Sequence, residues 1–307
     1  AYGIEGLKQG VEFIWRPSII QKSVKEDMSW EINPKNRLDL GFDFSAFQND
    51  AGSFLPNAPG SAIEKFPMTT ENSREMSVYV GHSTRLTEKI SLDYGLRYAM
   101  YQLVGPLDFY TYKTGTPRAF NTLKDTTQYA AGSVIQTYGG FEPRLSLAFK
   151  VDTSLSIKAG FTRMQQFRHL LSNTMAISPV DVWKNANPYL PQQIADQYSL
   201  GIFKNFTNDQ NAVFETSLEL YYKDLKNVVD YVDGAALYLN PTVETELLVG
   251  KGRAYGAELF LKKARGIRLT GWISYTYART FRQIEANAEQ APANFGLEFP
   301  ANFDTPH

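Results

Sequence analysis

The sequence contains no cysteine, and this absence excludes disulfide bonds, thiolate metal sites and thiol nucleophiles. Only three histidines occur, His82, His169 and His307, and no two of them share a metal-ligand spacing such as H-x-x-x-H. No run of about 18 consecutive apolar residues is present, so no transmembrane helix is predicted. We therefore expect neither a metal site nor a cofactor.

Neither sign of charge is in excess, because the sequence has 31 Lys and Arg residues and 32 Asp and Glu residues, which gives a net charge of −1. A nucleic-acid-binding protein would show a basic excess or basic runs. Hydrophobic residues make up 43% and charged residues 21%, as in ordinary folded proteins. The unusual feature is the 14% of aromatic residues, which favour strands and interfaces.

Catalytic motifs are absent as well. The sequence has no G-x-S-x-G elbow and no G-x-x-x-x-G-K-[ST] loop, and Gly250-Lys251-Gly252 precedes a predicted strand instead of a helix. Glu215 and Glu219 share one strand face at a separation of about 13 Å, whereas hydrolytic carboxylate pairs need about 5–10 Å. We predict no catalytic residue and no enzyme. A catalytic site assembled from residues far apart in the sequence would show no such motif and stays open as an alternative.

Alternation with a period of two dominates the chain. Between Arg37 and Gln48, an apolar residue occupies nearly every even position and a polar one nearly every odd position, and alternate side chains of a strand point to opposite faces. No long amphipathic helix is evident. The predicted strands are Met28–Asn33, Arg37–Gln48, Ser73–Leu86, Lys89–Gln102, Phe141–Val151, Thr153–Arg163, Gln193–Phe206, Phe214–Tyr222, Lys251–Lys263 and Ile267–Phe281, with an eleventh candidate in Gly6–Arg16.

The connections alternate strictly between short and long. The short ones are 34–36, 87–88, 152, 207–210 and 264–266, and the long ones are 49–72, 103–137, 166–192, 225–250 and the segment from 282 onward. Strands joined in this way run up and down. Every short turn should then lie at one end of an antiparallel meander and every long loop at the other.

Two architectures share this alternation, a soluble β-sandwich and a membrane β-barrel. The predicted strands have about 10–14 residues, whereas soluble strands typically have about 5–6 and tilted membrane strands about 9–11. Outer-membrane barrels typically have short turns at one end and long loops at the other. They also have aromatic rings toward the strand ends, as the predicted strands do at Tyr98, Tyr101, Phe203 and Phe206. We therefore predict an all-β membrane barrel with its apolar face toward lipid.

Ten or eleven strands without a visible closing partner would leave two open edges in lipid. The chain is therefore expected to form part of a larger barrel, and to be a fragment or a processed product of a longer protein.

Several motifs carry a family resemblance. They are Glu142–Lys150, Ser156–Arg163, Gln166–Asn173, Ser178–Trp183, Pro191–Gln197, Gly250–Glu258, Gly271–Thr276 and Phe299–His307. Their order and spacing resemble the barrel of TonB-dependent outer-membrane receptors, particularly the Bacteroidetes type. The resemblance is strongest from Glu142 to His307.

The resemblance implies that residues 1–307 are a partial barrel domain, and that the plug domain and the last strands lie outside this chain. Such barrels close with about 22 strands. The implied function is energised uptake of a scarce nutrient across the outer membrane of a Gram-negative bacterium. The implied partners are outer-membrane lipid, the TonB complex acting through the plug, a small nutrient ligand and, as an optional partner, a surface lipoprotein. A passive porin-like channel stays open as an alternative, followed by a soluble carbohydrate-binding or hydrolytic β protein.

Some residues have two interpretations. Trp183 lies on a predicted long loop and could stack on a ligand, but we favour a loop that Pro179, Asp181 and Trp183 fold onto itself or onto the barrel rim. His169 follows Arg168 in a loop or at a strand end and has no partner motif for metal binding. His82 shares the face of Val78 and Val80, which favours an interfacial position, and His307 ends the chain. The substrate-binding residues are unknown from sequence.

Arg253 and Glu258 lie on one predicted strand, and their odd separation places them on opposite faces. Arg253 should share the mainly apolar face with Tyr255 and Leu259, at its aqueous edge. Glu258 should face the lumen as a wall residue that contacts the plug.

Overall fold

The computed structural model describes residues 4–6, 13–57, 59, 61–62, 64–172, 181–207, 212–238, 240–265 and 269–304. In this part of the chain the regular structure consists of strands and three short 3-10 turns, η1 (Phe120–Thr122), η2 (Val243–Thr245) and η3 (Asn294–Gly296). Within the same residues, no helix has the length and apolar content needed to cross a bilayer.

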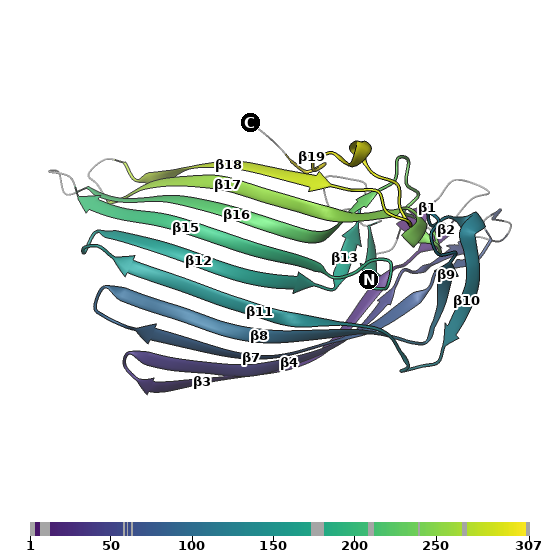
Figure 1. The fold of residues 1–307 in the computed structure, drawn as a ribbon, viewed down its shortest axis with the longest axis horizontal. Helices are drawn as coiled ribbons and strands as arrows, with labels where there is room; N and C mark the ends of the chain where they lie inside the picture. Colours follow the sequence, from purple (N-terminus) through teal and green to yellow (C-terminus); the bar gives the residue numbers. More distant parts are fainter. Residues whose placement is uncertain are drawn as a thin grey trace.

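One antiparallel sheet dominates the fold and forms an open, curved wall (Figure 1). Its strands pair in chain order, which confirms the predicted meander, and each of the ten long ones overlaps one of the ten predicted strands. They are β3 (Ser18–Asn33), β4 (Asn36–Asp50), β7 (Thr70–Arg85), β8 (Ile90–Val104), β11 (Val134–Lys150), β12 (Leu155–Gln166), β15 (Gln193–Thr207), β16 (Val213–Tyr231), β17 (Leu247–Arg265) and β18 (Gly271–Gln283), followed by the two-residue β19 (Phe299–Pro300).

The eleventh strand predicted in Gly6–Arg16 is not part of this wall. The segment contributes β1 (Ile4–Gly6) and β2 (Phe13–Trp15) to a separate four-stranded sheet with β5 (Ser53–Pro56) and β6 (Phe66–Pro67). Residues 7–12 lie outside the described part. Pro17, which has no backbone N–H, separates β2 from β3. The eleventh member of the wall is β19 instead.

Several predicted boundaries were wrong, with the largest errors at the start of β3 and at the end of β16, and β11 also begins at Val134 and not at Phe141. β3 begins at Ser18 and not near Met28, because Lys22 and Glu26 interrupt the apolar side of its alternation. The predicted loop 225–250 is strand at both of its ends, since β16 and β17 stay paired up to Tyr231 and Leu247. A register shift next to Asn227, whose φ is +58°, lets this pairing continue through a bulge.

The short turns lie at one end of the wall and the long connections at the other, as predicted (Figure 1). The long connections carry their own strands. β9 (Leu107–Tyr112) pairs with β10 (Leu123–Tyr129), and β13 (Arg168–Leu171) pairs with β14 (Val182–Asn185).

Apolar side chains of the wall are exposed and several polar ones are buried, which is the reverse of the arrangement in a soluble protein. Large apolar residues of the wall are exposed on one face, such as Val78 (60%), Leu200 (45%) and Leu259 (53%), whereas Ser77 and Glu142 on the other face are buried. No second sheet covers the apolar face among the strands that the structure describes. A soluble sandwich would instead pack this face against a second sheet around a dry core.

Candidate functional site

The exposed face of the wall is an apolar band bordered by aromatic rings. On β11, Phe141, Leu145, Leu147 and Phe149 occupy alternate positions and are all exposed. Near the loop end, Tyr98 contacts Phe141 with ring centroids 5.1 Å apart. Aromatic girdles at both edges of an apolar band are the signature of a strand wall in lipid.

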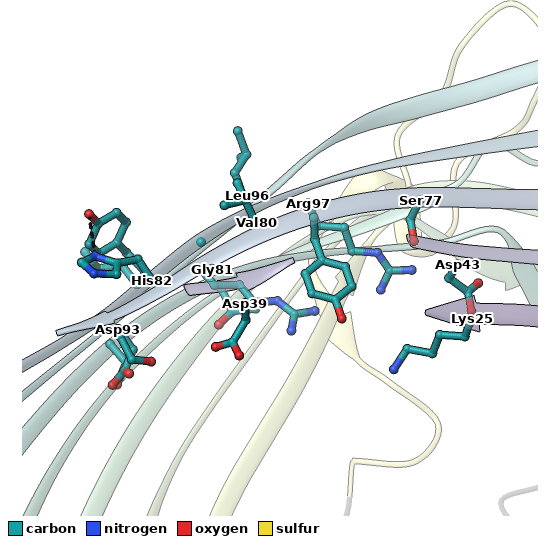
Figure 2. Close-up of a pocket in the computed structure, with 18 residues that line it drawn as sticks. Lys25, Asp39, Asp43, Ser77, Val80, Gly81, His82, Asp93, Leu96 and Arg97 are labelled. Carbon is teal, nitrogen blue, oxygen red and sulfur yellow. Dashed lines mark hydrogen bonds between the residues drawn. The ribbon is translucent and has the colours of Figure 1, made fainter. Parts of the chain in front are cut away.

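The opposite face is polar and carries a groove of about 780 Å³. Lys25, Asp39, Asp43 and Arg97 project to this side, whereas Leu96 projects to the apolar side (Figure 2). The groove forms where Gly81 and Gly95 pair directly across β7 and β8 and provide no side chain. Its lining carries both signs of charge on the inner side and also includes His82, Tyr94 and Leu96 of the apolar side.

Tyrosines of the inner face lie over glycines of the neighbouring strand. A Cβ at Gly41 would come within 2.4 Å of Tyr79 Oη, and one at Gly256 within 2.7 Å of the Tyr221 ring. Each glycine thus provides the space that its directly paired tyrosine occupies. A larger residue at Gly41 or Gly256 would displace the paired tyrosine ring from its position against the inner wall.

The β13–β14 hairpin of the 167–192 connection docks against the inner face of β7. Arg168 Nε lies 3.1 Å from Glu75 Oε1, and its guanidinium is 3.5 Å from the ring centroid of Phe47. Glu71 accepts a hydrogen bond from the backbone N–H of Asn185 (3.0 Å) and pairs with Lys184 Nζ (2.5 Å). A connection between β12 and β15 is thereby fixed to the distant strands β4 and β7.

Burial alone would lower the pKa of Lys184, but the carboxylates of Glu71 and Glu244 outweigh it and the pKa is raised. Lys184 therefore stays charged, and its attraction to Glu71 is maintained in a mostly buried position, where such pairs are sensitive to loss of one partner.

Two buried clusters hold the loop end together. One cluster contains Leu171, Val182, Leu190, Val229, Leu237, Val243 and Leu247, and the other Ala99, Tyr101, Leu103, Leu107, Phe167 and Ala186. Tyr101 stacks on Phe167 (5.2 Å) and donates a hydrogen bond to the carbonyl of Ala186 (3.0 Å). The long connections therefore form a packed cap whose core is separate from the lipid-facing band.

Arg118 joins four connections at one point. Its Nη1 lies 3.1 Å from Glu289 Oε2, its Nε donates to the carbonyl of Glu244 (3.4 Å), and its guanidinium is 5.3 Å from the Tyr189 ring centroid. The Arg118 side chain is 8% exposed, and Tyr112 Oη donates to Glu244 Oε1 (2.8 Å) beside it. Sequence reasoning missed these residues, because their contacts join segments 71 to 171 residues apart.

Trp183 lies in β14 with 38% of its surface exposed, and its backbone carbonyl accepts a hydrogen bond from Asn49 Nδ2. Asp181 is buried, and Pro179 lies outside the described residues. The hydrogen bond from Asn49 ties Trp183 to the loop end of β4, as expected for a connection that folds onto the barrel rim. Whether Trp183 also contacts a ligand stays a prediction.

Arg253 lies on the outer face directly opposite Phe281 and makes a bidentate contact with Glu298 (2.7 and 2.6 Å). Glu258 lies on the inner face directly opposite Glu219, and both carboxylates are exposed. Directly opposed like charges destabilise a strand pair.

We expect Glu258→Gln to raise the free energy of unfolding by about 0.5 kcal/mol, because it removes one of these opposed charges. Glu215→Gln is the matched control, since Glu215 pairs with Lys262 at 2.9 Å, and we expect it to lower stability. Urea unfolding in lipid measures both, and equal signs for the two variants would contradict the assignment.

The histidines lie in different parts of the chain and do not form a common site among the described residues. His82 Nδ1 lies 3.1 Å from Tyr94 Oη on the outer face, and His307 lies outside the described residues. The described residues contain no group of three or more His, Asp or Glu side chains placed to hold a metal ion. His169 is 2% exposed in β13, and burial, opposed in part by the backbone of Pro191, lowers its pKa to about 4.

This shift predicts acid-sensitive docking of the β13–β14 hairpin. The pKa of His169 is about 4 in the folded state and about 6.5 when unfolded, so its contribution to stability is complete above pH 6.5 and is lost as pH falls toward 4. Amide exchange of Arg168–Leu171, corrected for intrinsic rates, should show weaker protection at pH 4.5 than at pH 7. His169→Gln should flatten this dependence, and an unchanged profile would contradict the assignment.

A meander wall with a lipid-facing apolar band, a polar inner face and a packed cap of long connections is the wall of a large membrane β-barrel. Sequence comparison supports this class independently, because the family model for the TonB-dependent receptor-like β-barrel matches residues 16–305. The chain belongs to the TonB-dependent receptor β-barrel family, whose members lie in the outer membrane of Gram-negative bacteria.

Solved structures share the fold. The FrpB iron transporter from Neisseria meningitidis (F5-1 variant) has a TM-score of 0.58 and 11% identity over 92% of this chain and 39% of its own. The copper transporter OprC has a TM-score of 0.56 and 13% identity over 91% and 44%. The pyoverdine outer-membrane receptor FpvA from Pseudomonas aeruginosa PAO1 has a TM-score of 0.52 and 14% identity over 90% and 41%.

The chain thus spans less than half the length of each of these structures. No match was found among curated protein sequences.

Proposed function

We propose that residues 1–307 are a partial barrel domain of an energised transporter that takes up a scarce nutrient through the outer membrane. The observation that carries this proposal is the family match over 16–305, combined with a wall that is apolar outside and polar inside. In the complete protein, a plug domain outside this chain would fill the lumen and respond to the TonB complex.

The proposed ligand class is a metal or a metal chelate. The support is the description of similar structures as an iron transporter, a copper transporter and a pyoverdine receptor. The cap of long connections fits a capture surface, because its packed clusters hold the exposed side chains in place before a ligand arrives. A Bacteroidetes origin and a surface lipoprotein above the cap belong to the same proposal, on the resemblance of the motifs alone.

The test is uptake by the native host with and without the gene. We expect deletion to abolish accumulation of radiolabelled iron or copper from dilute chelates, and complementation by the full-length gene to restore it. A protonophore or loss of TonB should abolish uptake in the complemented strain. Uptake that continues after either treatment would contradict energised transport and favour the passive channel.

A further inference from the structure

The outer face of β15, β16 and β17 carries a basic cluster at the short-turn end. Phe206 and Phe214 face each other across β15 and β16 and stack with centroids 5.0 Å apart. Lys263 lies directly opposite Phe214 on β17, and Lys204 lies two residues before Phe206 on the same side of β15. Both lysines therefore border the aromatic pair on the lipid-facing side of the wall.

Lys263 has no carboxylate within ion-pair distance among the described residues, whereas Lys204 lies near Asp152 of the β11–β12 turn, whose carboxylate accepts a hydrogen bond from the same Ser154 hydroxyl. Lys204 Nζ donates to Ser154 Oγ (2.7 Å), and neither lysine makes an ion pair within the described residues. The nearby acid Glu215 points to the inner face and pairs with Lys262. Among described strand residues within four positions of a short turn, the acids all lie on the inner face: Glu31, Asp39, Asp93 and Glu215.

The loop end of the same strands is different. Lys226 and Lys251 also pair directly on the outer side of β16 and β17, but Lys251 lies 4.0 Å from Glu285. Two arginines on the outer side near the loop end are also paired, Arg163 with Asp196 and Arg253 with Glu298. Among the described residues, Arg163, Lys251 and Arg253 make direct ion pairs at the loop end, whereas Lys204 and Lys263 at the turn end make none.

The position of the cluster corresponds to a membrane surface. Tyr198 and Phe206 lie on the same face of β15, eight residues apart, which is about 26 Å along the strand and about 20 Å along the membrane normal at the usual tilt of about 40°. The apolar band of an outer-membrane barrel is roughly 25 Å tall. Phe206 and Phe214 therefore lie near the boundary between hydrocarbon and headgroups. Lys263 lies at the level of these rings, and Lys204 lies two residues inside them, so its side chain has to extend past the rings to reach the headgroup phosphates.

We propose that Lys204 and Lys263 bind the phosphate of an anionic phospholipid in the periplasm-facing leaflet, with its upper acyl chains against Phe206 and Phe214. A lipid fits better than a soluble anion, because the cations lie on the lipid-facing side and flank rings at the hydrocarbon boundary. Each basic residue near an anionic surface contributes measurably to binding. This inference rests on the membrane placement in the proposed function and is independent of the transported ligand and of TonB.

Native mass spectrometry of the full-length protein, released from vesicles of phosphatidylglycerol and phosphatidylcholine, tests the proposal. We expect phosphatidylglycerol to be retained preferentially, and K204Q/K263Q to reduce its retention by about tenfold at low salt. The matched control K226Q/K251Q removes the same charge at the loop end and should retain lipid as the native protein does. K204R/K263R keeps the charge and should also retain it.

Equal loss in K226Q/K251Q, or equal retention of phosphatidylcholine, would overturn the proposal. Displacement of the lipid by millimolar inorganic phosphate would overturn it too, because it would identify a site for free phosphate. Heat-modified mobility on gels confirms that each variant is folded. Because the readout is bound lipid, a failed uptake experiment leaves this result unaffected, and the reverse also holds.

Discussion

Arginine in place of Leu145 should destabilise the barrel by about 2–4 kcal/mol in lipid. Leu145 is 47% exposed on β11, midway between the outer-face rings of Phe141 and Phe149. A charge there would lie near the middle of the hydrocarbon, where no water or carboxylate compensates it. In a water-soluble protein, a charge at a half-exposed leucine would change stability by about 0.5 kcal/mol or less. Urea unfolding of the full-length protein refolded into vesicles measures the difference.

Ser146→Arg is the matched control for this prediction. Ser146 is the next residue of β11, is exposed, and lines the inner groove directly opposite Asp93. We expect a change of less than about 1 kcal/mol, since the new guanidinium would face water and a carboxylate. Equal effects at positions 145 and 146, or a larger effect at 146, would contradict the assignment of the two faces.

Glu71→Gln should free the β13–β14 hairpin from the inner wall. The variant keeps an oxygen that can accept the N–H of Asn185 but removes the charge opposite Lys184. The Lys184 side chain is 18% exposed and that of Glu71 7%, so the ammonium would be left mostly buried without its partner. We expect a loss of about 2–3 kcal/mol in the free energy of local opening, somewhat below the 3–5 kcal/mol typical of fully buried pairs. Amide hydrogen exchange of Val182–Asn185 measures this opening.

The double variant E71Q/K184M separates the charge from the packing. It removes the stranded ammonium and should recover most of the lost protection, because an apolar replacement of both partners is often neutral. Protection of the β17–β18 ladder serves as the internal control and should stay unchanged in both variants. An E71Q variant whose hairpin exchanges as in the native protein would show that the ion pair does not hold it.

The wall was predictable from sequence because its physics is local. Alternation of apolar and polar residues in windows of about ten residues locates each strand and both of its faces. The strand boundaries were predicted wrongly where the alternation of apolar and polar residues is interrupted. Charged residues at positions 22 and 26 hid the first half of β3, and a bulge at Asn227 concealed the extension of β16.

The cap was not predictable in the same way. Glu71 meets Lys184, and Arg118 meets Glu289, through contacts between segments that share no motif and no period. Such contacts depend on the curvature that brings distant connections together at one rim. Trp183 was predicted on a long connection that folds onto itself or onto the barrel rim, and its backbone carbonyl accepts a hydrogen bond from Asn49 at the end of β4. Asn49 and Glu71 were themselves predicted in the connection 49–72, whereas they belong to the extended ends of β4 and β7.

A nitroxide scan along β11 from Arg144 to Phe149, with the full-length protein in vesicles, tests the central claim most directly. At Leu145, Leu147 and Phe149, which face outward, collisions with lipid-dissolved oxygen should dominate. At Arg144, Ser146 and Ala148, which face inward, collisions with a water-soluble nickel chelate should dominate. Odd positions shielded from both reagents would indicate a dry core between two sheets and would contradict the lipid-facing wall.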